Sequence, residues 1–332
     1  MNSPSQYTSI NRALIVGGTH GDEMSGVVLA KHWLKDPSEL HRKTFTTKAV
    51  IGNPLAVERC TRYIDMDLNR SFAQENLSAS ESESDPYEVK RAREIYQNHV
   101  KKEAVDFICD LHNTTSNMGA TILLCKAGDH FSLHMANYLQ KNCLDYALPS
   151  HVYLIDTKEG ENIYLQNITR HSLALELGPQ PQGVIRADIL SRMRNLVNCC
   201  LDFIDLFNQG TEFPCFELEM YKVASKVDYP RDADGEIEGI IHKELQDKDY
   251  LPLKPGDPTF QTLKGTELFY DGKEEIYPTF INEAAYYEKK VAFIVMQKIH
   301  QMEVCLTHLS NDNGLVLTGN MQRRRGTVKV RD

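Results

Sequence analysis

The sequence has no long hydrophobic run and no excess of basic residues. None of its apolar stretches approaches the roughly 20 residues that a membrane-spanning helix needs, and residues 1–11 lack the apolar core of a secretory signal. Its 37 Lys and Arg stand against 46 Asp and Glu, which gives a net charge of -9. Nucleic acids and anionic membranes usually bind a basic face, so this charge argues against both as main partners. We expect a cytoplasmic protein without a transmembrane segment.

Closely spaced cysteine pairs are also lacking. The eight cysteines form no Cys-x-x-Cys motif, and they stand at positions 60, 109, 125, 143, 199, 200, 215 and 305. This scatter predicts reduced thiols rather than a disulfide framework or a cysteine-bound zinc ion. The composition is that of a soluble globular protein, with 41% hydrophobic and 25% charged residues. A chain of 332 residues suffices for one large domain or two of ordinary size.

The stretch GGTHGDE, from Gly17 to Glu23, places two potential metal ligands at the end of an apolar run. Residues 13–16 are typical of a buried strand, the glycines interrupt it, and residues 25–35 have helix-like apolar spacing. His20 and Glu23 lie three residues apart at the helix entrance, where an imidazole and a carboxylate can converge on one cation. The pair alone is a weak signal, because helix starts often carry both residue types for capping and macrodipole reasons.

A second histidine follows another apolar run. Residues 105–111 predict a strand that ends at His112 and the polar turn TTSN. Since the loops after neighbouring strands of an open α/β sheet converge on one edge, His112 is expected near His20 and Glu23. Two histidines and a glutamate leave one position of tetrahedral zinc open, which is the arrangement of a hydrolytic site. The alternative for His112 is a histidine whose hydrogen bonds merely stabilise a strand end.

The segment CTRYIDMDLNR, residues 60–70, has neither helix nor strand periodicity and is dense in Arg, Asp and Asn. Arg62 and Arg70 offer planar donor groups that suit a carboxylate or a developing oxyanion, and Asn69 can donate beside them. This composition favours a loop that binds a ligand. The alternative is a solvated surface loop with Asp–Arg pairs.

Glu176 interrupts the apolar run SLALEL at residues 172–177. Burying a carboxylate costs several kcal/mol unless the group has a partner or a function. Burial also raises the pKa of a carboxyl group, which suits a general base acting on water beside zinc. The alternative is a buried ion pair with a nearby arginine.

The first two thirds of the chain alternate short apolar runs with amphipathic stretches. The expected strands are 13–16, 46–51, 105–111, 120–125, 152–155 and 172–177, and the expected helices are 25–35, 86–100, 131–140 and 187–207. This alternation is typical of an α/β domain with a mostly parallel sheet flanked by helices. We assign this domain to residues 1–210.

The pattern of apolar runs, prolines and glycines changes after residue 210. Short alternating runs punctuated by Pro and Gly predict a smaller C-terminal β domain over residues 211–309 that covers the active-site cleft. Within it, the polar and aromatic segment 281–290 could reach over the first domain's site, or it is an ordinary surface turn with core tyrosines. Residues 310–332 are polar, carry a basic run, and predict a poorly ordered tail.

Taken together, the motifs resemble the aspartoacylase and aminoacylase III family of zinc amidohydrolases, whose fold is related to that of zinc carboxypeptidases. The resemblance runs from about residue 12 to about residue 300. It rests on GGTHGDE, CTRYIDMDLNR, DPYEVKRA, DLHNTTSN, LELGPQPQGVIRADI, VDYPR, LQD and NEAAYYEK, in this order. It implies a zinc-carboxypeptidase-like α/β fold and an N-acyl amino acid as the small-molecule substrate.

The resemblance also implies roles for individual residues. One Zn²⁺ per subunit would be held by His20, Glu23 and His112, with Glu176 as the catalytic base and Arg62 polarising the scissile carbonyl. Asn69, Arg70 and Tyr286 would surround the substrate carboxylate, and for Tyr286 the residues themselves had suggested no role. The family resemblance further implies a homodimer or homotetramer, and a peripheral association with the apical plasma membrane.

One departure separates the two branches of the family. Aspartoacylases carry an arginine ten residues before the base glutamate, where it pairs with the second carboxylate of N-acetyl-aspartate, and here that position is Gln166. Without this charge the pocket should prefer the substrates of aminoacylase III, which are N-acetyl aromatic amino acids and N-acetylcysteine S-conjugates (mercapturates). Arg170 could substitute for the arginine, so aspartoacylase activity is the alternative. An inactive relative that binds a protein partner is a further one.

Overall fold

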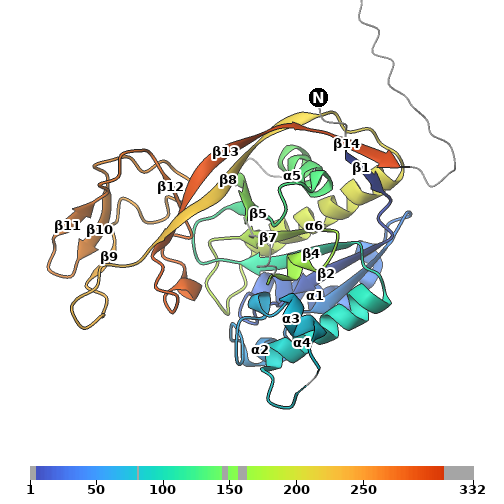
Figure 1. Ribbon diagram of the computed structural model, residues 1–332, viewed down its shortest axis with the longest axis horizontal. Helices are drawn as coiled ribbons and strands as arrows, with labels where there is room; N and C mark the ends of the chain where they lie inside the picture. Colours follow the sequence, from blue (N-terminus) through green and yellow to red (C-terminus); the bar gives the residue numbers. More distant parts are fainter. Residues whose placement is uncertain (1–4, 81, 144–148, 156–162, 310–332) are drawn as a thin grey trace, which may run out of the picture.

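The computed structural model describes residues 5–80, 82–143, 149–155 and 163–309. It shows a central sheet between helices, from which long strands extend to a small outlying β region (Figure 1). The predicted α/β fold, with its mostly parallel sheet and smaller C-terminal β domain, is confirmed. The expected tail, 310–332, lies outside the described residues. No described helix has the length and apolar character to cross a membrane.

The central sheet contains nine described strands. In spatial order they are β12 (Tyr277–Thr279), β13 (Phe293–Val304), β8 (Phe216–Val227), β6 (Ser150–Leu154), β5 (Ala120–Leu124), β7 (His171–Leu177), β4 (Phe107–Asn113), β2 (Arg12–Gly17) and β3 (Thr46–Ile51). Strands β3, β2, β4 and β7 are parallel, while β5 runs antiparallel to β7. The carboxyl ends of β2, β4 and β7 therefore meet at one edge of the sheet.

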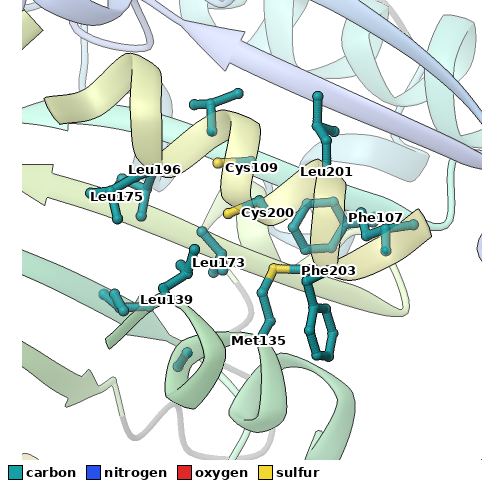
Figure 2. Packing of buried hydrophobic residues seen from close by; sticks show 14 of the residues in the cluster. Phe107, Cys109, Met135, Leu139, Leu173, Leu175, Leu196, Cys200, Leu201 and Phe203 are labelled. Carbon is teal, nitrogen blue, oxygen red and sulfur yellow. The ribbon is translucent and has the colours of Figure 1, made fainter. Parts of the chain in front are cut away.

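Helices α1 (Met24–Lys35), α5 (His130–Asn142) and α6 (Ala187–Asn208) cover one face of this sheet. Alternate residues of β4 and β7, such as Phe107 and Leu173, point to this face and pack against Met135 of α5 and Phe203 of α6 (Figure 2). All four side chains are buried. Burying a side chain of this size stabilises the fold by about 1.5–3 kcal/mol.

The opposite face carries the intervening residues of the same strands. Short helices cover it: α2 (Pro54–Arg59), α3 (Gln74–Ser78), α4 (Tyr87–Ile95), a π-helical turn at Tyr96–Lys102, and the 3₁₀ turns Leu68–Arg70 and Leu165–Asn167. Leu14 and Ile108 pack there against Phe72 and Ile95. Helix coverage of both faces explains why β4 and β7 are buried along their whole length.

The remaining elements belong to the chain ends and the C-terminal region. They are the turn Pro37–Leu40, the paired strands β1 (Ser5–Thr8) and β14 (Leu306–Leu309), the turn Ala284–Tyr286, and the three-stranded sheet of β9 (Gly239–Ile241), β10 (Pro258–Thr262) and β11 (Glu267–Phe269). Strands β8 and β13 pair with each other, and β8 also pairs with β6 of the central sheet. The division into domains at about residue 210 remains a prediction, because these strands continue the sheet of the preceding region.

The prediction that all cysteines are reduced thiols is wrong for four of them. Disulfides join Cys143 to Cys199 and Cys215 to Cys305, whereas the other four cysteines are free. The partners lie 56 and 90 residues apart in the sequence, so their spacing carried no sign that folding brings them together.

Candidate metal centre and active site

Three predicted ligands, His20, Glu23 and His112, come together at the carboxyl edge of the sheet. The Nδ1 atom of His20 lies 2.6 Å from Oε1 of Glu23, and Nδ1 of His112 lies 2.9 Å from Oε2 of the same carboxylate. The two Nδ1 atoms are 3.2 Å apart. All three residues are buried, and they form the candidate metal-ligand cluster found among the described residues. Two imidazole nitrogens and a carboxylate oxygen are a donor set that suits zinc.

Glycines bring the first two ligands to this position. Gly18 has a φ of 71°, a left-handed conformation that side chains disfavour. A Cβ atom on Gly21 would lie 2.1 Å from the carbonyl carbon of Ala56, so only glycine fits where the loop meets α2. The loop can therefore turn tightly after β2, which places His20 beside His112 on β4.

Each histidine is also held by a second carboxylate. Nε2 of His20 lies 3.0 Å from Oδ1 of Asp67, and Nε2 of His112 lies 2.7 Å from Oδ2 of Asp110. A carboxylate only accepts hydrogen bonds, so it keeps the proton on Nε2 and leaves Nδ1 free to bind a metal. Sequence reasoning missed both aspartates. Asp110 could have been found, because residues two apart in a strand share a face.

The charges of His20, Glu23 and His112 influence one another. Burial disfavours ionisation of Glu23, but the neighbouring His20 and His112 hold the pKa of its carboxyl well below the usual range. Burial likewise disfavours the charged form of His112, whereas Asp110 and Glu23 raise its pKa well above the ordinary value. The cluster thus attracts positive charge into a buried place, as a cation site should.

Glu176 lies beside this cluster, on β7. It is paired in register with His112 of β4, so the two side chains share one face of the sheet. Burial raises the pKa of Glu176 to about 8, with His112 opposing the shift. Among the described residues Glu176 has no side-chain hydrogen bond and no ion pair, and only 8% of its surface is exposed. The alternative of a buried Glu–Arg ion pair therefore does not hold within the described residues.

Arg62 faces the same carboxylates. Its Nη1 donates to Oε1 of Glu23 at 3.2 Å, and its Nη2 donates to Oδ2 of Asp67 at 3.3 Å. Although burial opposes the charge, these two acids raise the pKa of Arg62. An Asp–Arg pair does exist in this loop, but it is partly buried in the site, with 17% of the Arg62 and 7% of the Asp67 side chain exposed, rather than solvated. The pair leaves the buried Nε of Arg62 without a partner among the described residues.

Asn69 and Arg70 follow on the 3₁₀ turn Leu68–Arg70. Oδ1 of the buried Asn69 accepts a hydrogen bond from the backbone N–H of Leu165 at 2.9 Å. The guanidinium of Arg70 lies 4.7 Å from the ring centroid of Tyr164 and donates to the backbone oxygen of Asn69 at 2.7 Å. No described carboxylate forms an ion pair with Arg70. Its charge is therefore stacked in a fixed orientation and available to an anion.

The segment 281–290 reaches this site, as the sequence suggested. Buried Glu283 accepts hydrogen bonds from the backbone N–H of Thr115 at 2.8 Å and of Ser116 at 3.3 Å, and also from the hydroxyl of Thr114. These three residues follow β4, just beyond His112. The anchored turn carries Tyr286, whose pKa is raised by burial and by the nearby Glu176.

Gln166 and Arg170 lie in different places. Gln166 is buried in the turn Leu165–Asn167 and its Nε2 donates to Oδ2 of Asp110 at 2.9 Å. Arg170 instead donates to the hydroxyl of Thr8 at 2.9 Å and lies over the ring of Tyr7. Arg170 precedes β7, whereas Glu176 lies near its carboxyl end, roughly 20 Å away at about 3.3 Å per residue. This position argues against Arg170 as a substitute for the aspartoacylase arginine.

Family models match most of the chain. Residues 9–204 match the succinylglutamate desuccinylase/aspartoacylase catalytic domain, and residues 216–298 match the AstE/AspA barrel-sandwich hybrid domain. Among solved structures, murine aminoacylase 3 is similar with a TM-score of 0.86 and 45% identity, over 90% of this chain and 98% of that one. Succinylglutamate desuccinylase from Vibrio parahaemolyticus shares the fold, with a TM-score of 0.58 and 16% identity over 90% of this chain and 84% of that one.

Curated relatives are similar over nearly their whole length. A Xenopus tropicalis protein named N-acyl-aromatic-L-amino acid amidohydrolase (carboxylate-forming) is 64% identical over 90% of this chain and 97% of its own. A human protein of the same name is 49% identical over 87% of this chain and 91% of its own. A Danio rerio aspartoacylase is 49% identical over 85% of this chain and 90% of its own. The chain therefore belongs to the succinylglutamate desuccinylase/aspartoacylase family of enzymes.

Proposed function

We propose that this protein is a zinc-dependent amidohydrolase that hydrolyses N-acyl, mainly N-acetyl, amino acids to a carboxylate such as acetate and the free amino acid. The observation that carries the proposal is Glu176: a buried carboxyl group with no partner among the described residues, in register with His112 of the candidate metal centre. A buried carboxyl group without a structural partner is costly to keep, which favours a catalytic role.

His20, Glu23 and His112 would hold one zinc ion per chain. When bound, zinc supplies Lewis-acid activation of water and of the scissile carbonyl. Glu176 takes the proton of the attacking water and passes it to the leaving nitrogen, a role that its raised pKa suits because the group must both accept and return the proton near neutral pH. Asp67 and Asp110 keep both imidazoles in the tautomer that presents Nδ1.

Arg62 and the residues around Arg70 would orient the substrate. The charged guanidinium of Arg62 faces the metal-ligand cluster and can stabilise the oxygen on which negative charge develops as the carbonyl is attacked. Arg70 can pair with the α-carboxylate that all N-acyl amino acids share, with Asn69 and Tyr286 beside it. Because Glu283 anchors the turn that carries Tyr286, the C-terminal region completes this site. We propose that it also narrows access, so that free amino-acid derivatives are preferred over peptides.

The side-chain preference follows from the residue at position 166 and from the relatives. Gln166 provides no charge for the second carboxylate of aspartate, and Arg170 lies elsewhere. The Xenopus tropicalis relative named N-acyl-aromatic-L-amino acid amidohydrolase is 64% identical to this chain, whereas the Danio rerio aspartoacylase is 49% identical. We therefore propose N-acetyl aromatic amino acids and mercapturates as substrates. Aspartoacylase activity is the second candidate, because the human amidohydrolase is no more similar to this chain than the Danio aspartoacylase is.

Side-by-side kinetics separate the two candidates. The zinc-loaded protein should turn over N-acetyl-tyrosine, N-acetyl-phenylalanine or an aryl mercapturate with a kcat/KM more than roughly tenfold above that for N-acetyl-aspartate, since a lost buried ion pair is worth several kcal/mol. Gln166→Arg should shift activity toward N-acetyl-aspartate. If the wild-type protein instead had a higher kcat/KM for N-acetyl-aspartate than for these substrates, aspartoacylase activity would be the better assignment. Hydrolysis of long peptides would contradict the narrowed access.

The proposal extends to assembly and location. A homodimer or homotetramer is expected by family resemblance, and light scattering after size-exclusion chromatography would determine the number of chains. A cytoplasmic location, with peripheral association at the apical plasma membrane, can be tested by cell fractionation. Because disulfides are uncommon in the cytoplasm, the thiol content of protein isolated from cells would also show whether Cys143–Cys199 and Cys215–Cys305 form there.

A further inference from the structure

Asp110 lies at the centre of a fully buried hydrogen-bond network behind His112. Its Oδ1 accepts from the hydroxyl of Thr19 at 2.7 Å, and its Oδ2 is 2.7 Å from Nε2 of His112. The third contact is the amide of Gln166, whose Nε2 donates to the same Oδ2 at 2.9 Å. Asp110 has no solvent exposure and Gln166 only 2%, so no bulk water can replace this amide.

The chemistry of this contact fixes the orientation of the Gln166 side chain. An ionised carboxylate accepts hydrogen bonds and cannot donate, so the amide must turn its nitrogen toward Asp110. The opposite orientation would set two oxygens against each other. As a result Oε1 of Gln166 points away from Asp110, and it has no hydrogen-bond partner within the described ranges. An unpaired buried oxygen is unfavourable, which indicates that the contact with Asp110 determines this arrangement.

The backbone of Gln166 is held independently of its side chain. The hydroxyl of Ser172 donates to the backbone oxygen of Gln166 at 2.7 Å, and the neighbouring N–H of Leu165 donates to Asn69 at 2.9 Å. The turn can therefore keep its place when the amide is removed. Conversely, loss of the Ser172 hydroxyl would loosen the turn without removing the amide. Variants of Gln166 and Ser172 therefore distinguish a role of the amide in the metal centre from a role of the turn in packing.

We propose that Gln166 is a positioning residue of the metal centre, which acts on His112 through Asp110. The amide holds Oδ2 of Asp110 where it can accept from Nε2 of His112, and so it fixes the direction in which Nδ1 of His112 points. This inference rests on the proposed zinc site. It gives Gln166 a second role, in addition to its lack of a charge that could pair with the side-chain carboxylate of N-acetyl-aspartate. Groups that hydrogen-bond a metal ligand directly, as Asp110 does, typically change metal affinity roughly 10- to 100-fold, and Gln166, one contact further out, should act toward the lower end of this range.

Zinc affinity, measured by competition with a chromophoric chelator, tests the proposal without relying on activity. Gln166→Met keeps the length of the side chain but cannot donate, and zinc binding should weaken by roughly 10-fold or more. Ser172→Ala is the matched control, with zinc affinity expected within about 2-fold of wild type. Thermal unfolding of the metal-free proteins reports any general loss of stability. Equal zinc affinity in Gln166→Met and wild type would overturn the inference.

A double-mutant cycle shows whether the effect passes through Asp110. Gln166→Met should weaken zinc binding in the wild-type background but have little further effect beside Asp110→Asn, because the acceptor that the amide holds is then altered. Additive effects would overturn the route through Asp110. If Gln166→Met does not fold, Gln166→Glu, which sets a carboxylate against Asp110, should still weaken zinc binding, and unchanged affinity there would overturn the inference. A wild-type protein that binds no zinc would overturn the proposed metal centre itself, and the inference with it.

Discussion

Replacing Glu176 with glutamine should remove catalysis and leave the fold intact. Glutamine has the same shape but cannot accept a proton from water, and general-base catalysis contributes about 10²- to 10⁴-fold to a rate. This corresponds to roughly 3–5 kcal/mol of barrier. Because burial raises the pKa of Glu176 from 4.5 to about 8, an ionised Glu176 costs the metal-free fold at most about 5 kcal/mol above pH 8. Glu176→Gln should therefore be no less stable than wild type.

Glu88 provides a control because it is also buried, but its carboxylate has hydrogen-bond partners. Its carboxylate accepts from the backbone N–H groups of Ile64, Asp65 and Met66, and from the amide of Asn53. A glutamine there loses some of these charge-assisted hydrogen bonds, each worth about 1.5–3 kcal/mol. Glu88→Gln should thus lower the unfolding temperature clearly, whereas Glu176→Gln should lower kcat without doing so.

Steady-state kinetics on N-acetyl-tyrosine, with zinc content measured on the same samples, give the assay. The base must be ionised, so kcat/KM of the wild type should rise with pH and level off above a pKa no higher than about 8, since the charge of bound zinc lowers that value. Glu176→Gln should lose at least about 100-fold in kcat while it keeps its zinc. Retention of activity within about tenfold of wild type would refute the assignment of Glu176 as the base.

Three further outcomes follow from the same structure. Arg62→Lys should reduce kcat by about 100-fold with little change in KM, because lysine lacks the planar donor that faces the oxyanion; an unchanged kcat would exclude Arg62 from that role. Arg70→Leu should lower kcat/KM by at least about 30-fold, because the ion pair with the substrate α-carboxylate, worth about 2 kcal/mol or more, is lost. If the wild type hydrolysed an α-amide substrate as fast as the free acid, this pairing would be contradicted. Burial raises the pKa of Asp249 from 3.8 to about 7, so the folded protein resists ionisation of this group and its stability falls as the pH rises from about 4 through 7. In urea unfolding, the free energy of unfolding of Asp249→Asn relative to wild type should therefore rise by on the order of 3 kcal/mol between pH 5 and 8. A difference that does not change with pH would show that Asp249 is ionised throughout.

The sequence predicted the parts of the site that lie at strand ends. Apolar runs locate β2, β4 and β7, and parallel strands bring their carboxyl ends to one edge, which is why His20, His112 and Glu176 could be expected together. Asp110 and His112 lie two residues apart in one strand and share a face, so the hydrogen bond between them could have been inferred, although it was not predicted. For these residues, periodicity and sheet topology are enough.

The contacts made by loops could not be predicted in this way. Asp67 reaches His20 from an irregular segment whose path is set by tertiary contacts, among them Asn69 with Leu165. Glu283 binds the turn after His112, although it lies 167 residues further along the chain than Ser116 of that turn. The two disulfides likewise join cysteines that are distant in sequence. Local periodicity carries no information on such pairings, because they form only when separate elements pack.

Zinc reconstitution tests the central claim most directly. Protein stripped with a chelator should have no measurable activity on N-acetyl-tyrosine, and titration with zinc should restore it in proportion to the metal bound. Activity and bound zinc should both saturate at one ion per chain, since His20, Glu23 and His112 form a single cluster. Full activity in the stripped protein, or saturation with zinc without any activity, would contradict the account.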